Sequence, residues 1–389
     1  MKRILSVFAL VFALVCVLAS CDLPFLPGTG TTPEGTTPEE TTPAGTTPVR
    51  PTPDDTFPTS QGLTYEENWD GVTCTVRGIG TCTDEDIYIG GYIDGYKVTG
   101  IDGSAFYGSV NLMSVTIGNS VTEIGESAFS NCTNLINVTI GDAVTTIGSF
   151  AFNGCQNLKS VTIGNSVTTI DEWAFDYCLN LVEVINKSSL DITVGSSEHG
   201  GVALYAKEVH NGATKMVNLN DYLFYTCDGA NYLLGYVGTD TVLNLPETYN
   251  GQNYEIYQYA FSGRTNLASV TVSDYVTGIG ADAFSGCGNL ASVTIGNSVT
   301  TIGEHAFLNC ANLTSITIPD SVNIIDRYAF EYCESLTSII FANPNGWKHK
   351  HQSDAPGGTS ISATEFSDDE TAAQLLVYDL NHEYWYRLG

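Results

Sequence analysis

The sequence predicts a mainly β repeat solenoid, a fold in which thin coils of chain stack along one axis. The first observation is an Ala-Phe pair that recurs every 23 residues, in two runs of four. Its phenylalanines are Phe106, Phe129, Phe152, Phe175, Phe261, Phe284, Phe307 and Phe330. The second is that a leucine six residues after each Phe and an isoleucine five residues before it keep the same period. A fixed period of roughly 20 to 50 residues indicates one supersecondary unit per repeat, which buries its apolar face only against its neighbours.

Within one repeat, the residue pattern predicts two short strands joined by turns. In Ser160–Ile163, apolar Val161 and Ile163 alternate with polar residues, which is the period of a half-buried strand. Residues 164–166 turn the chain, and residues 167–170 form a second extended piece. The Ala-Phe-x-x-Cys segment then closes the coil and is too short for more than a turn or two of helix. We therefore expect thin coils with a spine of stacked phenylalanines.

The full repeat phrase is Ile-Gly-x-x-Ala-Phe-x-x-Cys-x-x-Leu-x-x-Val-x-Ile-(Gly/Pro)-x-Ser-Val. It is nearly complete at residues 124–144, 147–167, 279–299 and 302–322. This phrase resembles the BspA-like (Treponema-type) leucine-rich repeat surface lipoproteins of bacteria. The resemblance implies leucine-rich-repeat coils and a role in adhesion to host proteins or to other cells. Because the family is defined by its scaffold, the resemblance implies no particular ligand.

The N-terminus predicts export and a lipid anchor. Lys2 and Arg3 precede an apolar run that ends in Leu-Ala-Ser-Cys21. A basic start, a short apolar run and small residues before a cleavage point are typical of a signal peptide, here residues 1–20. The sequence Leu-Ala-Ser-Cys at residues 18–21 resembles a bacterial lipobox, which implies lipidation of Cys21 and anchoring in a membrane. We therefore expect the chain to be exported and held at the bacterial cell surface.

Composition and repeats divide the rest of the chain into segments. Residues 21–60 are rich in Thr and Pro, so they predict an extended tether without a core. Residues 61–97 predict a β-hairpin N-terminal cap, and residues 98–186 and 259–340 each hold four leucine-rich repeats. Between them, residues 187–258 form a β-rich insertion with a hairpin turn at Asp228-Gly229. The second run of repeats also follows a hairpin-like lead-in, so the sequence looks duplicated.

Residues 341–389 predict a C-terminal cap for the last coil. A capping-box pattern at residues 367–370 predicts a helix through about Val377, and Tyr384-Trp385-Tyr386 predicts a closing strand. An alternative is that these aromatics and Trp347 form a sugar-stacking surface. We favour the cap, because the core of the last coil would otherwise be exposed to solvent.

No residue pattern predicts catalysis, a metal site or a cofactor. Six cysteines occupy one repeat position, without the paired spacing of a zinc site, so we expect buried free thiols. The spacing of Cys74 and Cys82 would allow a disulfide across a hairpin, and the sequence leaves open whether they form one. The Lys348–His351 run reads as a solvated loop. The net charge of −29 argues against nucleic acid as a partner. We expect a non-enzymatic, monomeric protein.

Two surfaces are candidates for binding an extracellular protein or glycan. One is the outward Ser/Thr face of the strands, represented by Lys159, Thr162 and Glu183. The other is the insertion, whose aromatics suit specific contacts: Tyr205, Tyr222, Phe224, Tyr225, Tyr232 and Tyr236. The sequence favours the insertion, because the regular face repeats the same small residues. Adhesion through protein binding is the leading hypothesis; a carbohydrate-binding accessory protein and a structural surface-coat component are the alternatives.

Overall fold

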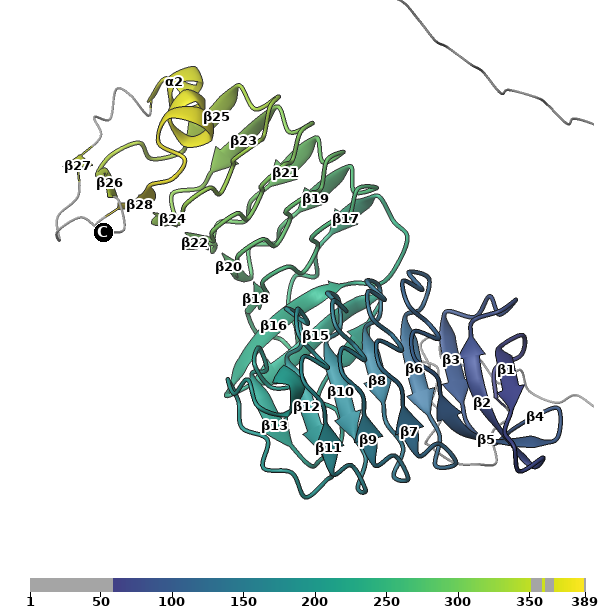
Figure 1. The fold of residues 1–389 in the computed structure, drawn as a ribbon. Helices are drawn as coiled ribbons and strands as arrows, with labels where there is room; N and C mark the ends of the chain where they lie inside the picture. The colour runs from purple at the N-terminus through teal and green to yellow at the C-terminus, as the bar shows by residue number, and fades with distance from the viewer. Residues whose placement is uncertain (1–58, 351–358, 361–366, 388–389) are drawn as a thin grey trace, which may run out of the picture. The chain divides into compact units, whose positions relative to one another are not determined.

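The computed structural model describes residues 59–350, 359–360 and 367–387 (Figure 1). All of them belong to one compact unit. The predicted signal peptide, Cys21 and nearly all of the Thr/Pro-rich tether lie outside the described residues. Within the described residues, no helix is long and apolar enough to cross a membrane.

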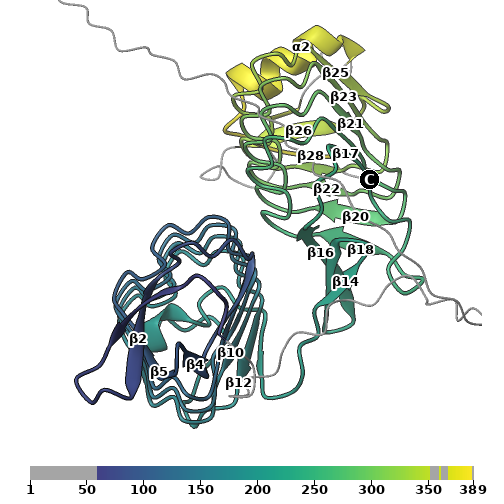
Figure 2. The ribbon, with the colours of Figure 1, turned by 90° about the vertical axis from the view of Figure 1, so that its right-hand side faces the viewer.

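The predicted solenoid is confirmed, as two blocks of stacked coils with separate apolar cores. Sheets A and B form the first block, and sheets C and D form the second (Figure 1). Consecutive coils place parallel strands in each sheet, in register from coil to coil. Figure 2 shows the coils of the first block lying over one another when viewed close to the stacking axis.

The strands of each sheet are as follows. Sheet A contains β1 Thr64–Glu67, β2 Thr73–Gly78, β4 Tyr92–Ile93, β5 Tyr96–Ile101, β7 Glu123–Ile124, β9 Thr146–Ile147 and β11 Thr169–Ile170. Sheet B contains β3 Asp86–Ile89, β6 Ser114–Ile117, β8 Asn137–Thr139, β10 Ser160–Ile163, β12 Glu183–Asn186 and β13 Glu208–His210. Sheet C contains β14 Val217–Leu219, β15 Tyr222–Cys227, β16 Ala230–Tyr236, β18 Tyr254–Ile256, β20 Val276–Ile279, β22 Thr301–Ile302, β24 Ile324–Ile325, β26 Trp347–Lys350, β27 Thr359–Ser360 and β28 Tyr384–Arg387. Sheet D contains β17 Val242–Asn244, β19 Ser269–Thr271, β21 Ser292–Thr294, β23 Ser315–Ile318 and β25 Ser338–Phe341.

The phenylalanine spine is confirmed. Within each block the rings of successive coils stack face to face, with centroids 4.9–5.5 Å apart. The rings are at most 1% exposed. This spacing is close to the distance of about 4.8 Å between hydrogen-bonded strands, because the same ladder sets both. The coil segment around each Phe forms turns rather than helix, and its amides bond to the next coil, as Phe152 N does to Ala174 O.

Two residues around each Phe have left-handed backbone angles. The residue two positions before it has a φ of 53–59° in all eight coils, although none is glycine: Ser104, Ser127, Phe150, Trp173, Tyr259, Asp282, His305 and Tyr328. The residue two positions after it is also left-handed and is Gly, Asn or Tyr. A non-Gly residue in this region costs roughly 1–2 kcal/mol. The ladder hydrogen bonds and the buried ring offset this cost in every coil.

The two lead-in hairpins are also confirmed, and they match each other. In the first block β1 pairs antiparallel with β2, which then pairs in parallel with β5. In the second block β15 pairs antiparallel with β16, which then pairs in parallel with β18. The internal duplication therefore includes the start of each block.

The sequence analysis expected the insertion to leave the solenoid after Asn186, and this expectation is wrong. Residues 187–210 instead make a fifth, irregular coil, whose strand β13 pairs in parallel with β12. The 3₁₀ turn η1 His199–Gly201 bonds to the preceding coil through Phe175 N and Gly200 O. Val202 and Ala203 fill the core where Phe is absent.

The C-terminal cap is confirmed. Helix α2 Asp369–Gln374 begins at an N-cap one residue later than the predicted box, at Asp368, and continues into the π-helix η2 Leu375–Asp379. Trp347 and Trp385 are 1% exposed within the second core, which rules them out as a sugar-stacking surface. The expected loop at Lys348–His351 is wrong for its described part, because residues 347–350 form β26, which pairs with β28.

Candidate functional site

Two of the aromatic residues proposed for binding are fully buried, so their assignment to a surface is wrong. Phe224 packs in the second core, 4.3 Å from the ring of Tyr249. Tyr225 lies on the other side of β15 and donates a hydrogen bond to Glu208. The hairpin β15–β16 therefore has two apolar faces, because the second face packs on Val182 of the first block. Because β15 lies between two apolar cores, its Phe224 and Tyr225 pack inside the protein.

The other insertion aromatics are half-buried, and Tyr222, Tyr232 and Tyr236 have partners within the chain. The hydroxyl of Tyr222 donates to Asn244 O, and that of Tyr236 donates to Asp240. The ring of Tyr232 lies 4.4 Å from Lys207 Nζ. Burial raises the pKa of the Tyr205 hydroxyl. These contacts favour structural roles for the group, although part of each ring stays accessible.

Glu183 is the centre of a buried hydrogen-bond network, where the sequence analysis expected an exposed binding residue. Its carboxylate is 0% exposed and accepts from Ser160 Oγ at 2.7 Å, Thr214 Oγ1 at 2.6 Å and Lys215 N at 2.7 Å. His210 Nε2 lies 3.2 Å from the same carboxylate. Because Gly212 N donates to His210 Nδ1, the proton of this imidazole is on Nε2, which donates to Glu183.

This network holds the chain that follows β13 over the outer face of sheet B. Residues 212–214 line a small cavity there together with Thr139, Thr162 and Ile185. Thr162 is only 6% exposed, so the expectation of an open hydroxyl face is wrong for the first block. In the second block the equivalent Thr294 is exposed, and so are Thr271 and Thr317. Sheet D is therefore the open face of the solenoid.

The six repeat cysteines are buried, as predicted, and are at most 1% exposed. Each Sγ lies 3.0–3.3 Å from the carbonyl oxygen of the Phe 26 residues earlier, so the thiol donates along the stack. Cys74 and Cys82 are both free thiols. No group of three His, Cys, Asp or Glu side chains is placed to hold a metal within the described part of the chain.

We expect the six repeat cysteines to resist alkylation in the native protein. Burial raises the pKa of Cys132 and of Cys287 to about 12, so at pH 8 both are neutral thiols, which are poor nucleophiles. Iodoacetamide at pH 8, followed by peptide mass spectrometry, should label partly exposed Cys82 and leave the six unlabelled until urea is added. Rapid native labelling of Cys155, at the middle of the first stack, would contradict the packing.

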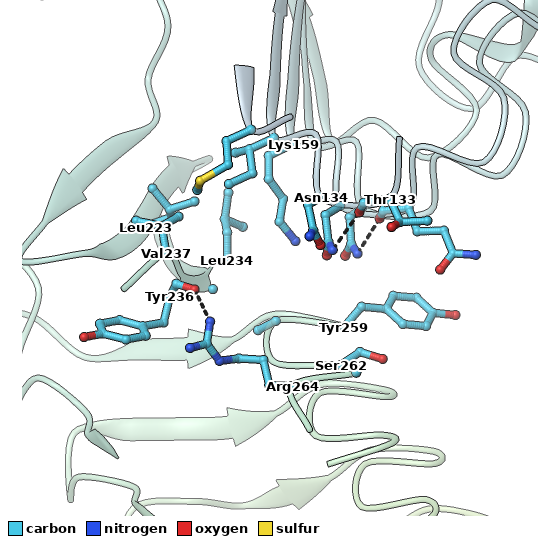
Figure 3. A pocket seen from close by; sticks show the side chains of 18 of the residues that line it. Thr133, Asn134, Lys159, Leu223, Leu234, Tyr236, Val237, Tyr259, Ser262 and Arg264 are labelled. Carbon is cyan, nitrogen blue, oxygen red and sulfur yellow. Dashed lines mark hydrogen bonds between the residues drawn. The ribbon is translucent and has the colours of Figure 1, made fainter. Parts of the chain in front are cut away.

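One large cavity lies beside the third coil of the first block (Figure 3). Its volume is about 720 Å³. One wall carries amide side chains of successive coils, including Asn134, Asn157 and Asn180. Another consists of Leu223, Leu234 and Val237 from the insertion, and the wall opposite the amides includes Tyr259, Ser262 and Arg264 (Figure 3).

Lys159 extends into this cavity, although the sequence analysis proposed it only as a surface contact. The residue is 3% exposed, and its Nζ has no hydrogen-bond partner among the described residues. Burial lowers its pKa to about 7. The signal for this site was available in the repeat itself, because the equivalent residues in the first block are Met113, Ile136 and Val182. A lone lysine in an apolar repeat position marks a departure from the scaffold.

A family model for the BspA-type leucine-rich repeat region matches residues 99–231 and 250–368, more than half of the chain. The chain belongs to the BspA-type leucine-rich repeat family. The family resemblance predicted from the repeat phrase is therefore confirmed.

Solved structures of similar leucine-rich repeat proteins include one described as a leucine-rich cell surface protein. That protein, from Faecalibacterium prausnitzii, is 23% identical over 72% of this chain and 93% of its own, with a TM-score of 0.35. The T. pallidum leucine-rich repeat protein is 22% identical over 65% of this chain and 89% of its own, with a TM-score of 0.30. A Bacteroides capillosus leucine-rich repeat protein is 32% identical over 33% of this chain and 99% of its own, with a TM-score of 0.30. No curated protein matches the chain.

Proposed function

We propose that this chain is a cell-surface adhesion protein that binds an extracellular protein of host or neighbouring cells through the outer face of sheet D. Family membership supports a surface scaffold without catalytic chemistry. The observation that carries the proposal is the contrast between the two blocks. The outer face of sheet B is covered by its own chain, whereas Thr271, Thr294 and Thr317 are exposed on sheet D.

The face of sheet D has the features of a broad contact surface. Its outward threonines repeat along parallel strands, and apolar side chains flank them at both ends. Val242 is 59% exposed and Ile340 is 47% exposed. Tyr275, 43% exposed, follows β19 at the turn out of the sheet and is suited to anchor a partner. Lipidation of Cys21, followed by the Thr/Pro-rich segment, would present this face away from the membrane.

The proposal predicts that arginines in the centre of the sheet D face weaken adhesion. The double variant Thr294→Arg/Thr317→Arg places two long charged side chains there and should weaken binding to immobilised matrix glycoproteins by about tenfold or more. Surface plasmon resonance and a cell-attachment assay measure this effect. Thr300→Arg is the matched control, because this exposed residue lies on the same coil beside sheet C.

Unchanged adhesion by the double variant would refute the role of sheet D. A loss of adhesion by Thr300→Arg as well would mean that added positive charge, and not the position, causes the effect. Circular dichroism should give the same spectrum for all three proteins, since the substituted side chains are exposed.

A further inference from the structure

We propose that the cavity beside Lys159 binds a sugar acid, a saccharide unit that carries a carboxylate and several hydroxyl groups. The cavity is separate from the face of sheet D, so this inference goes beyond the proposed adhesion function. Its volume of about 720 Å³ lies within the range of roughly 300–1,000 Å³ that is common for small-molecule sites. Its walls combine an apolar side with a dense set of amides and hydroxyls, which suits a saccharide ring.

The first argument is the lysine itself. Figure 3 shows the side chain of Lys159 extending between the apolar wall and the amides, with its nitrogen beside the amides. A buried ammonium group without a partner is unfavourable, which is why proteins pair such charges. The equivalent side chains Met113, Ile136 and Val182 show that this coil position does not need a charge. A ligand carboxylate would supply the missing partner.

Arg264 brings a second positive charge to the opposite wall. Its Nη1 and Nη2 donate to Tyr236 O and Gly238 O, which fixes the guanidinium, and its Nε is buried with no partner among the described residues. The two carboxylates that line the cavity are less available to oppose this charge. Glu85 is exposed to solvent, and Asp282 lies 3.9 Å from His305. In a chain of net charge −29, this is a local site for an anion.

The asparagines specify the rest of the ligand. Asn134, Asn157 and Asn180 occupy one repeat position, and each donates its Nδ2 to a carbonyl of the preceding coil. Their Oδ1 atoms are thereby left as acceptors, and that of Asn180 is buried without a partner in the described structure. Acceptors in series suit a ligand with several donors, such as the hydroxyls of a sugar. Sulfate lacks these donors, and a neutral sugar lacks the anion for Lys159.

Proton linkage makes the proposed binding of a sugar acid depend on pH. Because burial lowers the pKa of Lys159 to about 7, the amine is half charged at neutral pH. A carboxylate beside it favours the charged form and raises the pKa in the complex. Binding should therefore be strongest below pH 7 and weaken as the pH rises above 7. The other titratable groups at or behind the walls are Glu85, Tyr236, Tyr259, Arg264 and Asp282 with His305. The variant below must therefore remove the pH dependence to assign it to Lys159.

The test compares the full-length chain with its Lys159→Met variant by isothermal titration calorimetry against glucuronate, glucose and sulfate. Methionine is the side chain that the first coil already holds at this position, so the fold accepts it. Glucuronate should bind the wild-type chain at pH 6.5 and at least about tenfold more weakly at pH 8.5, with glucose and sulfate weaker than glucuronate. Lys159→Met should lose about tenfold or more in affinity at pH 6.5 and lose the pH dependence.

Further measurements test whether Lys159 serves ligand binding or stability, and whether the ligand is part of a glycan or a free sugar acid. Lys159→Met should keep or raise the urea midpoint, because it removes an unpaired buried charge; a lower midpoint would overturn the inference. Equal glucuronate binding by both proteins, or sulfate binding as tight as glucuronate, would also overturn it.

Tighter binding of a glucuronate-terminated oligosaccharide than of free glucuronate would indicate a glycan, and the reverse would indicate the free acid. A preference for peptides with a free C-terminal carboxylate over both would refute the sugar. Thr294→Arg/Thr317→Arg should bind glucuronate normally, so failure of one proposal leaves the other testable.

Discussion

Phe152→Ala is expected to lower the free energy of unfolding of the first block by about 3–5 kcal/mol. The ring is 0% exposed and lies between those of Phe129 and Phe175, with centroid distances of 5.2 Å and 5.0 Å. Alanine removes the contacts on both faces of the ring and leaves a cavity. The hydrogen-bonded ladder holds the flanking coils apart, because the backbone on both sides of residue 152 bonds to its neighbours. The coils therefore have little freedom to close the cavity.

The two blocks should respond separately to this substitution. Their phenylalanine stacks belong to different cores, and a solenoid distributes stability among nearest neighbours. Hydrogen exchange of the full-length Phe152→Ala chain should show faster exchange in residues 124–186 and near wild-type exchange in residues 279–325. Phe307→Ala, between Phe284 and Phe330 in the second block, should reverse this pattern.

Tyr177→Ala is the matched control for Phe152→Ala. Tyr177 is an aromatic residue of the next coil, 60% exposed, so its removal should change stability by about 0.5 kcal/mol or less. Urea denaturation followed by circular dichroism compares the three proteins. A Phe152→Ala chain as stable as Tyr177→Ala would mean that the coils collapse around the missing ring and that the stack does not support the block.

The repeat architecture could be predicted because every coil repeats the same local constraints. Alternation in Ser160–Ile163 predicts a strand, and the 23-residue period requires that strand to pair with its copies in register. The cap followed from the same reasoning, because an apolar end must be covered. Trp347 and Trp385 cover it. Each of these inferences depends only on what happens within one coil or between adjacent coils.

The exposure of each face could not be predicted, because it depends on where an irregular segment returns. Residues 160–167 and 292–299 have the identical sequence Ser-Val-Thr-Ile-Gly-Asn-Ser-Val. In the first copy Ser160 is 1% exposed and bonds to Glu183, whereas in the second copy Ser292 is exposed. The difference comes from residues 212–215, which lie about 50 positions further along the chain and carry no repeat signal.

The irregular fifth coil was missed for a similar reason. It has Gly200 where the preceding coil has Ala174 of the Ala-Phe pair, because Phe175 N bonds to Gly200 O as Phe152 N bonds to Ala174 O. Its strand β13 also follows β12 after 25 residues instead of 23. The Lys159 cavity, by contrast, left a trace in the sequence. A charged residue among Met113, Ile136 and Val182 indicates that one copy of a position that is otherwise apolar in the first block has been changed. Departures from a repeat are the positions where sequence alone indicates a site.

Glu183→Ala is expected to release the segment that covers sheet B, at a local cost of about 2–4 kcal/mol. The carboxylate accepts from Lys215 N at 2.7 Å and from His210 Nε2 at 3.2 Å, and alanine would leave these two partly buried donors without an acceptor. Each unsatisfied buried donor costs roughly 1–3 kcal/mol. The segment can avoid this cost by opening, so that its donors bond to water. Trypsin should then cleave after Lys215 much faster than in the wild-type chain, and the Lys215 amide should lose its protection from hydrogen exchange.

Glu183→Gln separates the hydrogen bonds from the charge. The amide oxygen of glutamine can accept from Lys215 N and His210, and its NH₂ can donate to the hydroxyls of Ser160 and Thr214, since hydroxyl groups also accept. We therefore expect Glu183→Gln to keep residues 212–215 in place and to be cleaved nearly as slowly as the wild-type chain. Ser292→Ala, at the equivalent exposed position of sheet D, should have no effect. If Glu183→Gln were cleaved as fast as Glu183→Ala, the negative charge itself would hold the segment; if neither were cleaved faster, packing alone would hold it and the network would be dispensable.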